Sequence, residues 1–331
     1  MQYRSVKGFT PLSQLGILFL FLAGGFILTA ITQMIISSYM IPAGTPLDKM
    51  GDVLKKALVD PKNVQIARLL QISGTFFLLF VPVVLYSLVT NGKNKFWLGF
   101  NKYVNIYQII IGFCIIFAAN ILAAPIEDLT KSIVAHSPSV DLLAKQLETA
   151  YNEQVMAMSK LESWPEFLIA IAIMAFFPAL FEEVLFRAGF QNILYRWLKS
   201  PIIAIIITSL LFSLVHMSVY LFLSRMVLGL VLGLMYHKTK NIWVNIIAHF
   251  LNNAIAVSQL FWMNMSNKKI DISKLDPKIP WIWGIFALIL LIIFFWLLNK
   301  VSAKNLTKIE AKEAELYAKG NTYDPFNQRT I

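Results

Sequence analysis

Residues 177–187 read FPALFEEVLFR, so two adjacent glutamates, Glu182 and Glu183, lie in one of the most apolar stretches of the chain. A carboxylate in a membrane-grade segment costs roughly 3 kcal/mol or more on insertion scales, so such residues are rare there unless they are paired or functional. Arg187 follows Glu183 at the helical i to i+4 spacing, which predicts a buried ion pair that supports the helix. Glu182 has no basic residue one turn away, so the pattern favours a functional role for it.

The composition indicates a membrane protein independently of this stretch. The chain has 331 residues, of which 57% are apolar and only 14% are charged, whereas a soluble domain carries about 25% charged residues. We therefore expect a helix bundle whose outer surface is apolar as well as its core. The single cysteine, Cys114, excludes an internal disulfide, and we interpret it as a small buried apolar side chain.

Eight apolar runs are long enough to predict transmembrane helices, which gives an all-α polytopic bundle of about eight spans. The spans are expected near residues 15–39, 67–90, 104–125, 167–197, 201–217, 219–236, 242–262 and 281–299. Segments 41–66 and 126–165 are too polar to span and predict loops with short interfacial helices. We divide the chain into N-terminal helices (1–164), a core that contains Glu182 and Glu183 (165–262), and a last span with a charged tail (263–331).

The short loops predict the orientation of the bundle. With eight spans, most basic loops and the lysine-rich tail fall on one side, which the positive-inside rule assigns to the cytoplasm, so both termini are expected there. The lysines of residues 268–278 are the exception. The net charge of +11 suits an anionic lipid leaflet rather than nucleic acid, because no basic-aromatic nucleic-acid motif is present. The expected location is a bacterial inner membrane or its equivalent.

Two histidines and an asparagine in later apolar segments are expected to lie near Glu182. If the helix that holds Glu182 continues to Leu198, the 1.5 Å rise per residue puts Glu182 roughly 24 Å and His216 roughly 22 Å from the cytoplasmic ends of their helices. By the same rise, Asn253 and His249 lie roughly 18 Å and 12 Å from the cytoplasmic end of their helix. His249 and Asn253 are four residues apart and share one helix face, on which Asn245 lies one turn earlier. A carboxylate, two imidazoles and an amide are groups that can activate water and stabilise an oxyanion.

These residues resemble a known family. The patterns Glu-Glu-x-x-x-Arg (182–187), Phe-x-x-x-His (212–216) and His-x-x-x-Asn (249–253) occur in order in three apolar helices. They resemble the CPBP family of CaaX proteases and bacteriocin-processing enzymes, which includes the type II CaaX prenyl endopeptidases. The resemblance covers roughly residues 165–260.

The resemblance implies a role for each of these residues. Glu182 would be the general base that takes a proton from water, and His216 would hold the same water. His249 and Asn253 would stabilise the oxyanion or position the substrate carbonyl, and Glu183 with Arg187 would support the site. Arg225, at a similar depth, is expected to bind a substrate carboxylate, to pair with Glu183, or to extend toward the membrane surface.

The part played by a metal stays open at this point. Glu182, His216 and His249 could form a three-ligand zinc site with an open fourth position. The short metalloprotease spacing His-Glu-x-x-His is absent, however, so the ligands would come from three separate helices. The sequence slightly favours a mechanism that requires no cofactor, with zinc as the alternative.

The function expected from these patterns is hydrolysis of a peptide bond in a membrane-embedded or lipid-anchored substrate, at a site that opens toward the cytoplasmic half of the membrane. One alternative is a non-catalytic membrane protein that confers bacteriocin resistance or scaffolds partners. In that case the polar cluster would only hold the helices together through hydrogen bonds. Another is a transporter with an ionisable midplane site, although the sequence lacks inverted hydropathy repeats.

Overall fold

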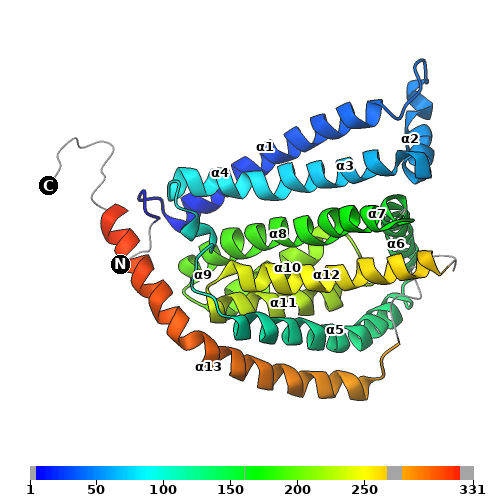
Figure 1. Cartoon of the computed structure of the whole chain (residues 1–331). Helices are drawn as coiled ribbons and strands as arrows, with labels where there is room; N and C mark the ends of the chain where they lie inside the picture. The colour runs from blue at the N-terminus through cyan, green and yellow to red at the C-terminus, as the bar shows by residue number, and fades with distance from the viewer. Residues whose placement is uncertain (1–4, 160, 267–277, 321–331) are drawn as a thin grey trace, which may run out of the picture.

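The computed structural model describes residues 5–159, 161–266 and 278–320, and over these ranges the chain is helical without any strand (Figure 1). The α-helices are α1 (Pro11–Ser38), α2 (Met50–Val59), α3 (Val64–Thr75), α4 (Val81–Thr90), α5 (Ile106–Val134), α6 (Pro138–Met158), α7 (Trp164–Ala170), α8 (Phe177–Glu183), α9 (Asn192–Leu198), α10 (Pro201–Val215), α11 (Phe222–Thr239), α12 (Ile242–Met265) and α13 (Trp281–Gly320). Short 3₁₀ turns cover Leu47–Lys49, Pro61–Asn63 and Lys95–Leu98. The predicted all-α fold class is confirmed.

Two of the long helices contain π-helical segments just before a proline. Phe76–Phe80 joins α3 to α4 ahead of Pro82, and Ile171–Phe176 joins α7 to α8 ahead of Pro178. Proline has no N–H and its ring clashes with the preceding turn, so a wider turn relieves the strain without ending the helix. A third π segment, Val184–Gln191, joins α8 to α9. Residues 164–198 therefore form one continuous helix that passes Arg187, as the depth argument requires.

Within the described part of the chain, six helical stretches are long and apolar enough to cross a membrane. They are Pro11–Ser38, Val64–Thr90, Ile106–Val134, Trp164–Leu198, Ile242–Met265 and Trp281–Lys319. The other two predicted spans, 201–217 and 219–236, are also helical, but α10 is only 15 residues long and α11 carries Arg225 and Lys238. Every predicted span thus corresponds to a helix, while the count of eight crossings remains a prediction.

The helices form three layers. In Figure 1, α1 packs with α3 and α4 along one edge, α8 to α12 make up the middle, and α5 packs with α13 along the other edge. The first two layers are joined by an apolar core in which Leu18, Val83, Phe186 and Ile193 are at most 1% exposed. Because lipid chains are as apolar as these side chains, it is the close packing of this seam that holds the N-terminal helices on the middle layer.

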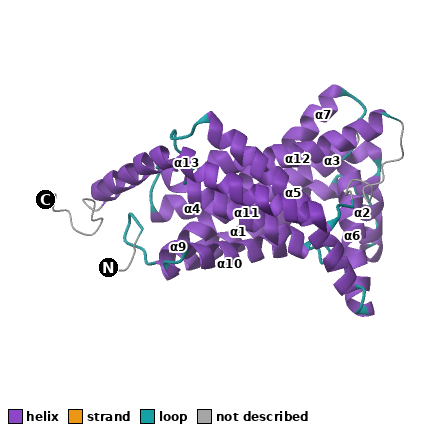
Figure 2. Cartoon of the chain, turned by 90° about the horizontal axis from the view of Figure 1, so that it is seen from below, coloured by secondary structure: helices purple, strands orange, loops and turns teal. Residues whose placement is uncertain are grey.

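The connections between helices gather at two opposite ends of the bundle. At one end, the main chain at Lys7 bonds to Thr90, Asn101 bonds to the Lys240 carbonyl, and Arg196 pairs with Glu313 of α13. The basic loops that the sequence predicts to share one side therefore do so. The opposite end holds α2 and α6 (Figures 1 and 2).

The segment 126–165 differs from its prediction. It was expected to be a loop with short interfacial helices, yet α5 extends to Val134 and α6 is 21 residues long. The reason is that the tertiary structure buries apolar side chains of α6 in two places, Ala144 against Val134 and Tyr220, and Ala157 with Met158 against Ala67. Arg68 of α3 donates two hydrogen bonds to the Met158 carbonyl and holds the last turn of α6 in place.

Substitution of Gly233 by valine is expected to lower stability by about 1–3 kcal/mol, because α11 and α10 are in close contact there. A Cβ atom on Gly233 would lie 2.9 Å from Ile205 Cγ2 and 3.1 Å from Gln191 Oε1. Gly24→Val is the matched control, since nothing lies within 4 Å of a Cβ at that position. Thermal unfolding of both variants in detergent measures the effect, and equal melting temperatures would contradict the expectation.

Candidate active site

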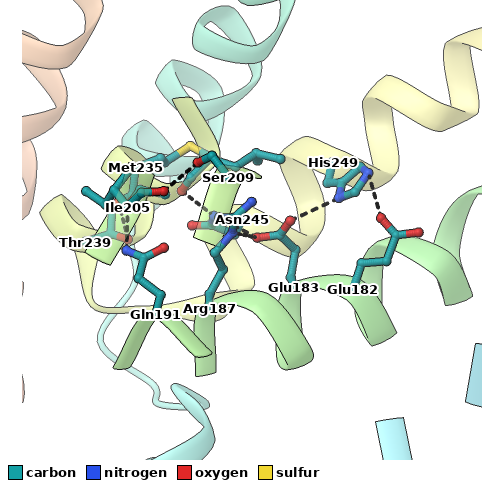
Figure 3. A network of polar contacts seen from close by, with 12 residues as sticks. Glu182, Glu183, Arg187, Gln191, Ile205, Ser209, Met235, Thr239, Asn245 and His249 are labelled. Carbon is teal, nitrogen blue, oxygen red and sulfur yellow. Dashed lines mark hydrogen bonds and ion pairs between the residues drawn. The ribbon is translucent and has the colours of Figure 1, made fainter. Parts of the chain in front are cut away.

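Glu182 and two histidines from different helices converge at one point inside the bundle. Glu182 is on α8, His216 follows the last residue of α10, and His249 is on α12. Glu182 Oε2 lies 3.7 Å from His216 Nε2 and 3.9 Å from His249 Nε2 (Figure 3 shows Glu182 facing His249). This oxygen is buried and has no hydrogen-bond partner among the described residues. The structure therefore brings together three of the residues that the sequence placed at similar depths.

The ring of His216 is fixed by main-chain atoms around the end of α10. Its Nδ1 lies 2.6 Å from the Phe212 carbonyl oxygen, which can only accept a hydrogen bond, so Nδ1 carries the proton. The helix ends there because Met217 adopts a left-handed conformation, with φ 50°. Arg225 of α11 donates to the His216 carbonyl at 3.2 Å. His216 Nε2 is thus left as an acceptor that faces Glu182.

His249 is held by a buried polar network (Figure 3). Its Nδ1 lies 3.1 Å from Glu183 Oε1, while Glu183 Oε2 accepts hydrogen bonds from Arg187 Nε and Asn245 Nδ2, both at 3.0 Å. Glu183, Arg187 and Asn245 are all 0% exposed. Asn245 also donates to the Leu232 carbonyl at 2.8 Å. The network contains the ion pair predicted for Glu183 and Arg187, and it aims His249 Nε2 at Glu182.

The remaining predicted site residues lie at the edge of this cluster. The Asn253 side chain accepts a hydrogen bond from Asn252 at 3.3 Å, and the described contacts do not link it to Glu182. Arg225 lies over the Tyr151 ring of α6, 5.2 Å from its centroid, in addition to its bond with His216. Its guanidinium therefore supports the His216 turn instead of pairing with Glu183.

Asn245 was not among the predicted site residues, although it belongs to the same helix face as His249 and Asn253. The signal in the sequence is the spacing of polar residues 245, 249 and 253 along an apolar helix. That spacing does not reveal that the Asn245 side chain donates a hydrogen bond to Glu183.

A cavity of about 620 Å³ reaches Glu182 and His216 from the N-terminal layer. Its walls come from α1, α2, α3 and α6, and Glu182, Phe186, Val215 and His216 line it as well. The cavity extends toward α2 and α6, which lie at the end opposite the basic loops. In the predicted orientation this is the outer end, so the cavity and the expected opening toward the cytoplasmic half do not agree; both the orientation and the side of the opening stay predictions. Depths of roughly 22–24 Å from the basic end already place Glu182 and His216 beyond the middle of a hydrocarbon core of about 30 Å.

The three converging side chains do not form a ready metal site. A tetrahedral zinc ion with bonds of about 2.0–2.1 Å holds neighbouring ligand atoms about 3.3–3.4 Å apart, whereas Glu182 Oε2 is 3.7 and 3.9 Å from the two imidazole nitrogens. Among the described residues, no group of three or more His, Cys, Asp or Glu side chains is placed to hold a metal ion. These side chains would have to move closer together before they could bind zinc.

Comparison with known proteins agrees with this geometry. The family described as type II CAAX prenyl endopeptidase Rce1-like matches residues 164–255, a segment that contains Glu182, His216 and His249. No curated protein and no solved structure is significantly similar to the chain. The family and the apolar helices support an integral membrane protein with intramembrane endopeptidase activity on a membrane-associated peptide. The CPBP resemblance is thus confirmed: residues 164–255 match the Rce1-like type II CAAX prenyl endopeptidase family, as the motifs predicted.

Proposed function

We propose that this chain is an intramembrane endopeptidase in which Glu182 activates the water molecule that cleaves a peptide bond. The observation that carries the proposal is the position of Glu182 Oε2, within 4 Å of Nε2 atoms of two histidines and on the wall of a large cavity. The proposed setting is a bacterial inner membrane or an equivalent membrane, and the substrate is a membrane-embedded or lipid-anchored peptide.

Glu182 and His216 are placed to share one water molecule. Their facing atoms are 3.7 Å apart, so a water with hydrogen bonds of about 2.8 Å can contact both at once. Because His216 Nδ1 donates to Phe212, Nε2 accepts one water proton as a hydrogen bond while Glu182 accepts the other. Both acceptors raise the electron density on the water oxygen, and Glu182 takes the proton as that oxygen attacks the scissile carbonyl carbon.

His249 acts in this mechanism as an imidazolium. Its Nδ1 proton points at Glu183, so a neutral ring would have no proton on Nε2 with which to donate to an oxyanion. The charges of Glu183 and Arg187 cancel each other. A positive charge on a protonated His249 would cancel the negative charge of Glu182 within the same buried cluster. We therefore propose a cationic His249, because its positive charge both neutralises the cluster and stabilises the oxyanion.

The cycle closes without any other reagent. After attack, the tetrahedral oxyanion is stabilised by His249 Nε2–H and by the amide of Asn253, one turn further along α12. The carbon–nitrogen bond then breaks as Glu182 returns the proton it took from water to the leaving nitrogen. The products are a carboxylic acid, which ionises, and an amine, so water supplies both new groups.

The mechanism requires no metal, and chelation provides a direct check. Dialysis of the purified protein against a strong chelator is expected to leave turnover within about twofold of the untreated value, because Glu182 and not a bound cation generates the nucleophile. Excess zinc is expected to inhibit, since it would compete for Glu182, His216 and His249. Loss of turnover on chelation and recovery with stoichiometric zinc would show instead that these residues bind a catalytic metal.

Cellular membranes offer the test that also finds the substrate. Cells that express the wild-type chain and cells that express Glu182→Gln at equal levels are compared for the termini of their membrane peptides and proteins. New termini that appear only with the wild type are expected, and they identify the cleavage position. Glu310→Gln, an exposed change on α13, serves as the control and is expected to match the wild type.

Identical sets of termini in all three samples, with each protein folded, would contradict proteolysis. The non-catalytic alternative makes the opposite prediction for a resistance or scaffolding phenotype, which Glu182→Gln would leave intact.

A further inference from the structure

We propose that Asn120 of α5 is a positioning residue for the hydrolysis: a relay of amide hydrogen bonds from Asn120 through Asn252 fixes the direction of the Asn253 amide. The inference rests on the proposed peptidase function, in which Asn253 donates a hydrogen bond to the oxyanion. It adds a residue that lies outside the family segment 164–255, and it gives a physical reason why the Asn253 amide offers a donor at the site and not an acceptor.

The relay begins where α5 packs closely against α12 (Figure 1). A Cβ atom on Gly112 of α5 would lie 3.2 Å from Val244 Cγ1 and 3.8 Å from Ala248 Cβ, so the two helices approach each other closely there. Asn120 is about two helical turns beyond Gly112. Asn252 is about one turn beyond Ala248, so the same contact continues to these two asparagines. At this point Asn120 Nδ2 donates a hydrogen bond to Asn252 Oδ1.

The main chain of α5 fixes the direction of the relay. Asn120 Nδ2 also donates to the Ile116 carbonyl at 2.9 Å, and a carbonyl oxygen can only accept a hydrogen bond. A reversed Asn120 amide would place its oxygen against the Ile116 oxygen, so that two acceptors would face each other. The nitrogen of the Asn120 amide therefore faces Ile116 and Asn252, and the atom that meets it on Asn252 must be the oxygen.

The same direction passes from Asn252 to Asn253. With its oxygen held by Asn120, the Asn252 amide uses Nδ2 to donate to Asn253 Oδ1 at 3.3 Å. The Asn253 oxygen thus points toward Asn252, and the two N–H groups of the amide point away from it. Asn253 shares a helix face with His249, whose Nε2 lies 3.9 Å from Glu182 Oε2. A reversed Asn253 amide would present an oxygen to the oxyanion and repel it.

Asparagines also hold membrane helices together without any part in catalysis, so the relay needs a matched control. Gln108 of α5 provides it, because it is 0% exposed and its side chain donates to Ser302 of α13 at 2.9 Å. It also accepts from Asn305 of α13 at 3.0 Å. Gln108→Leu therefore removes hydrogen bonds between α5 and another helix without a change to the relay.

Turnover in lipid vesicles measures the effect, with a fluorogenic peptide that spans the cleavage position found in the cellular comparison. Asn120→Leu keeps the size of the side chain but cannot hold Asn252. An Asn253 amide that reverses freely donates only about half of the time, and a misplacement of about 1 Å can cost about 10²-fold, so kcat is expected to fall about tenfold. KM is expected to change by less than about twofold, because the oxyanion exists only in the transition state. Gln108→Leu is expected to lower the melting temperature but to keep kcat within about twofold of the wild type.

A double-mutant cycle separates positioning from structural support. Asn253→Ala is expected to lower kcat by about 10²-fold or more, the loss typical of an oxyanion donor. If Asn120 acts only through Asn253, adding Asn120→Leu to Asn253→Ala is expected to lower kcat by less than about twofold further. Asn252→Leu breaks the middle of the relay and is expected to behave as Asn120→Leu does, which keeps the test valid if one of these two variants fails to fold.

Losses that multiply in the cycle would overturn the relay, and so would an equal fall of kcat in Gln108→Leu. Full kcat in Asn120→Leu and Asn252→Leu would overturn it as well. The proposed function is tested separately in the same assay, since it requires an active wild type and an inactive Glu182→Gln protein. An inactive wild type would overturn both proposals, whereas multiplying losses in an active protein would overturn only the relay.

Discussion

Replacement of Glu182 by glutamine is expected to lower kcat/KM of the purified protein in lipid vesicles by about 10³-fold or more, since a lost general base typically costs 10²–10⁴-fold. Glutamine keeps the size of the side chain and can still contact His216 and His249, but it cannot take a proton from water. Glu182→Asp is the graded control. It keeps a carboxylate that is one methylene too short, so we expect a smaller loss than with glutamine.

A double variant tests whether Glu182 and His216 act on one water molecule or contribute to turnover independently. If Glu182 and His216 act on the same water, Glu182→Gln combined with His216→Gln is expected to be hardly slower than Glu182→Gln alone, because residues that act as a unit are strongly non-additive. Losses that multiply would contradict the shared water. Equal melting temperatures of Glu182→Gln, His216→Gln and the double variant are the check that the losses are chemical and not due to misfolding.

Replacement of Glu183 by alanine is expected to destabilise the protein by about 3–5 kcal/mol, the typical cost of removing one partner from a buried ion pair. Arg187 would be left charged and fully buried, with its guanidinium carbon 5.6 Å from the centroid of the Phe212 ring. Asn245 and His249 would lose their acceptor as well. The measurements are the folded yield by size exclusion and the melting temperature in detergent.

Simultaneous removal of both charges distinguishes a structural role from a chemical one. The double variant Glu183→Gln with Arg187→Met leaves no unpaired buried charge, and we expect it to recover most of the lost stability. Its turnover is expected to stay reduced, because an amide holds the His249 ring without stabilising its positive charge. Normal yield of Glu183→Ala together with abolished turnover would show that Glu183 takes part in the chemistry directly.

The sequence predicts the helical framework well because apolar length and charge placement are local properties. All eight predicted spans correspond to helices, and the continuation of the long helix past Arg187 followed from the need to bring Glu182 level with the histidines. The family motifs indicated the residues that converge, since their side chains are expensive to place in an apolar helix and persist only where they are paired or used.

The cavity could not be predicted from the sequence in the same way. Its walls join residues of α1, α3 and α6 to Glu182 and His216, and no local pattern states which helix faces pack together. The long α6 was missed because its buried side depends on contacts with other elements. Asn245 was missed as a partner of Glu183, because its orientation depends on the crossing of α8 with α12.

The helices that wall the cavity have a consequence for how this enzyme could be altered. The family segment, residues 164–255, contributes Glu182, Phe186, Val215 and His216 to the wall, whereas the rest comes from α1, α2, α3 and α6, before that segment begins. Under the proposed function, chemistry and selectivity would be encoded in separate stretches of the gene. A chimaera that keeps residues 164–255 and exchanges the earlier wall would inherit the same hydrolytic machinery with a new substrate preference, provided that the seam at Leu18 and Val83 is preserved.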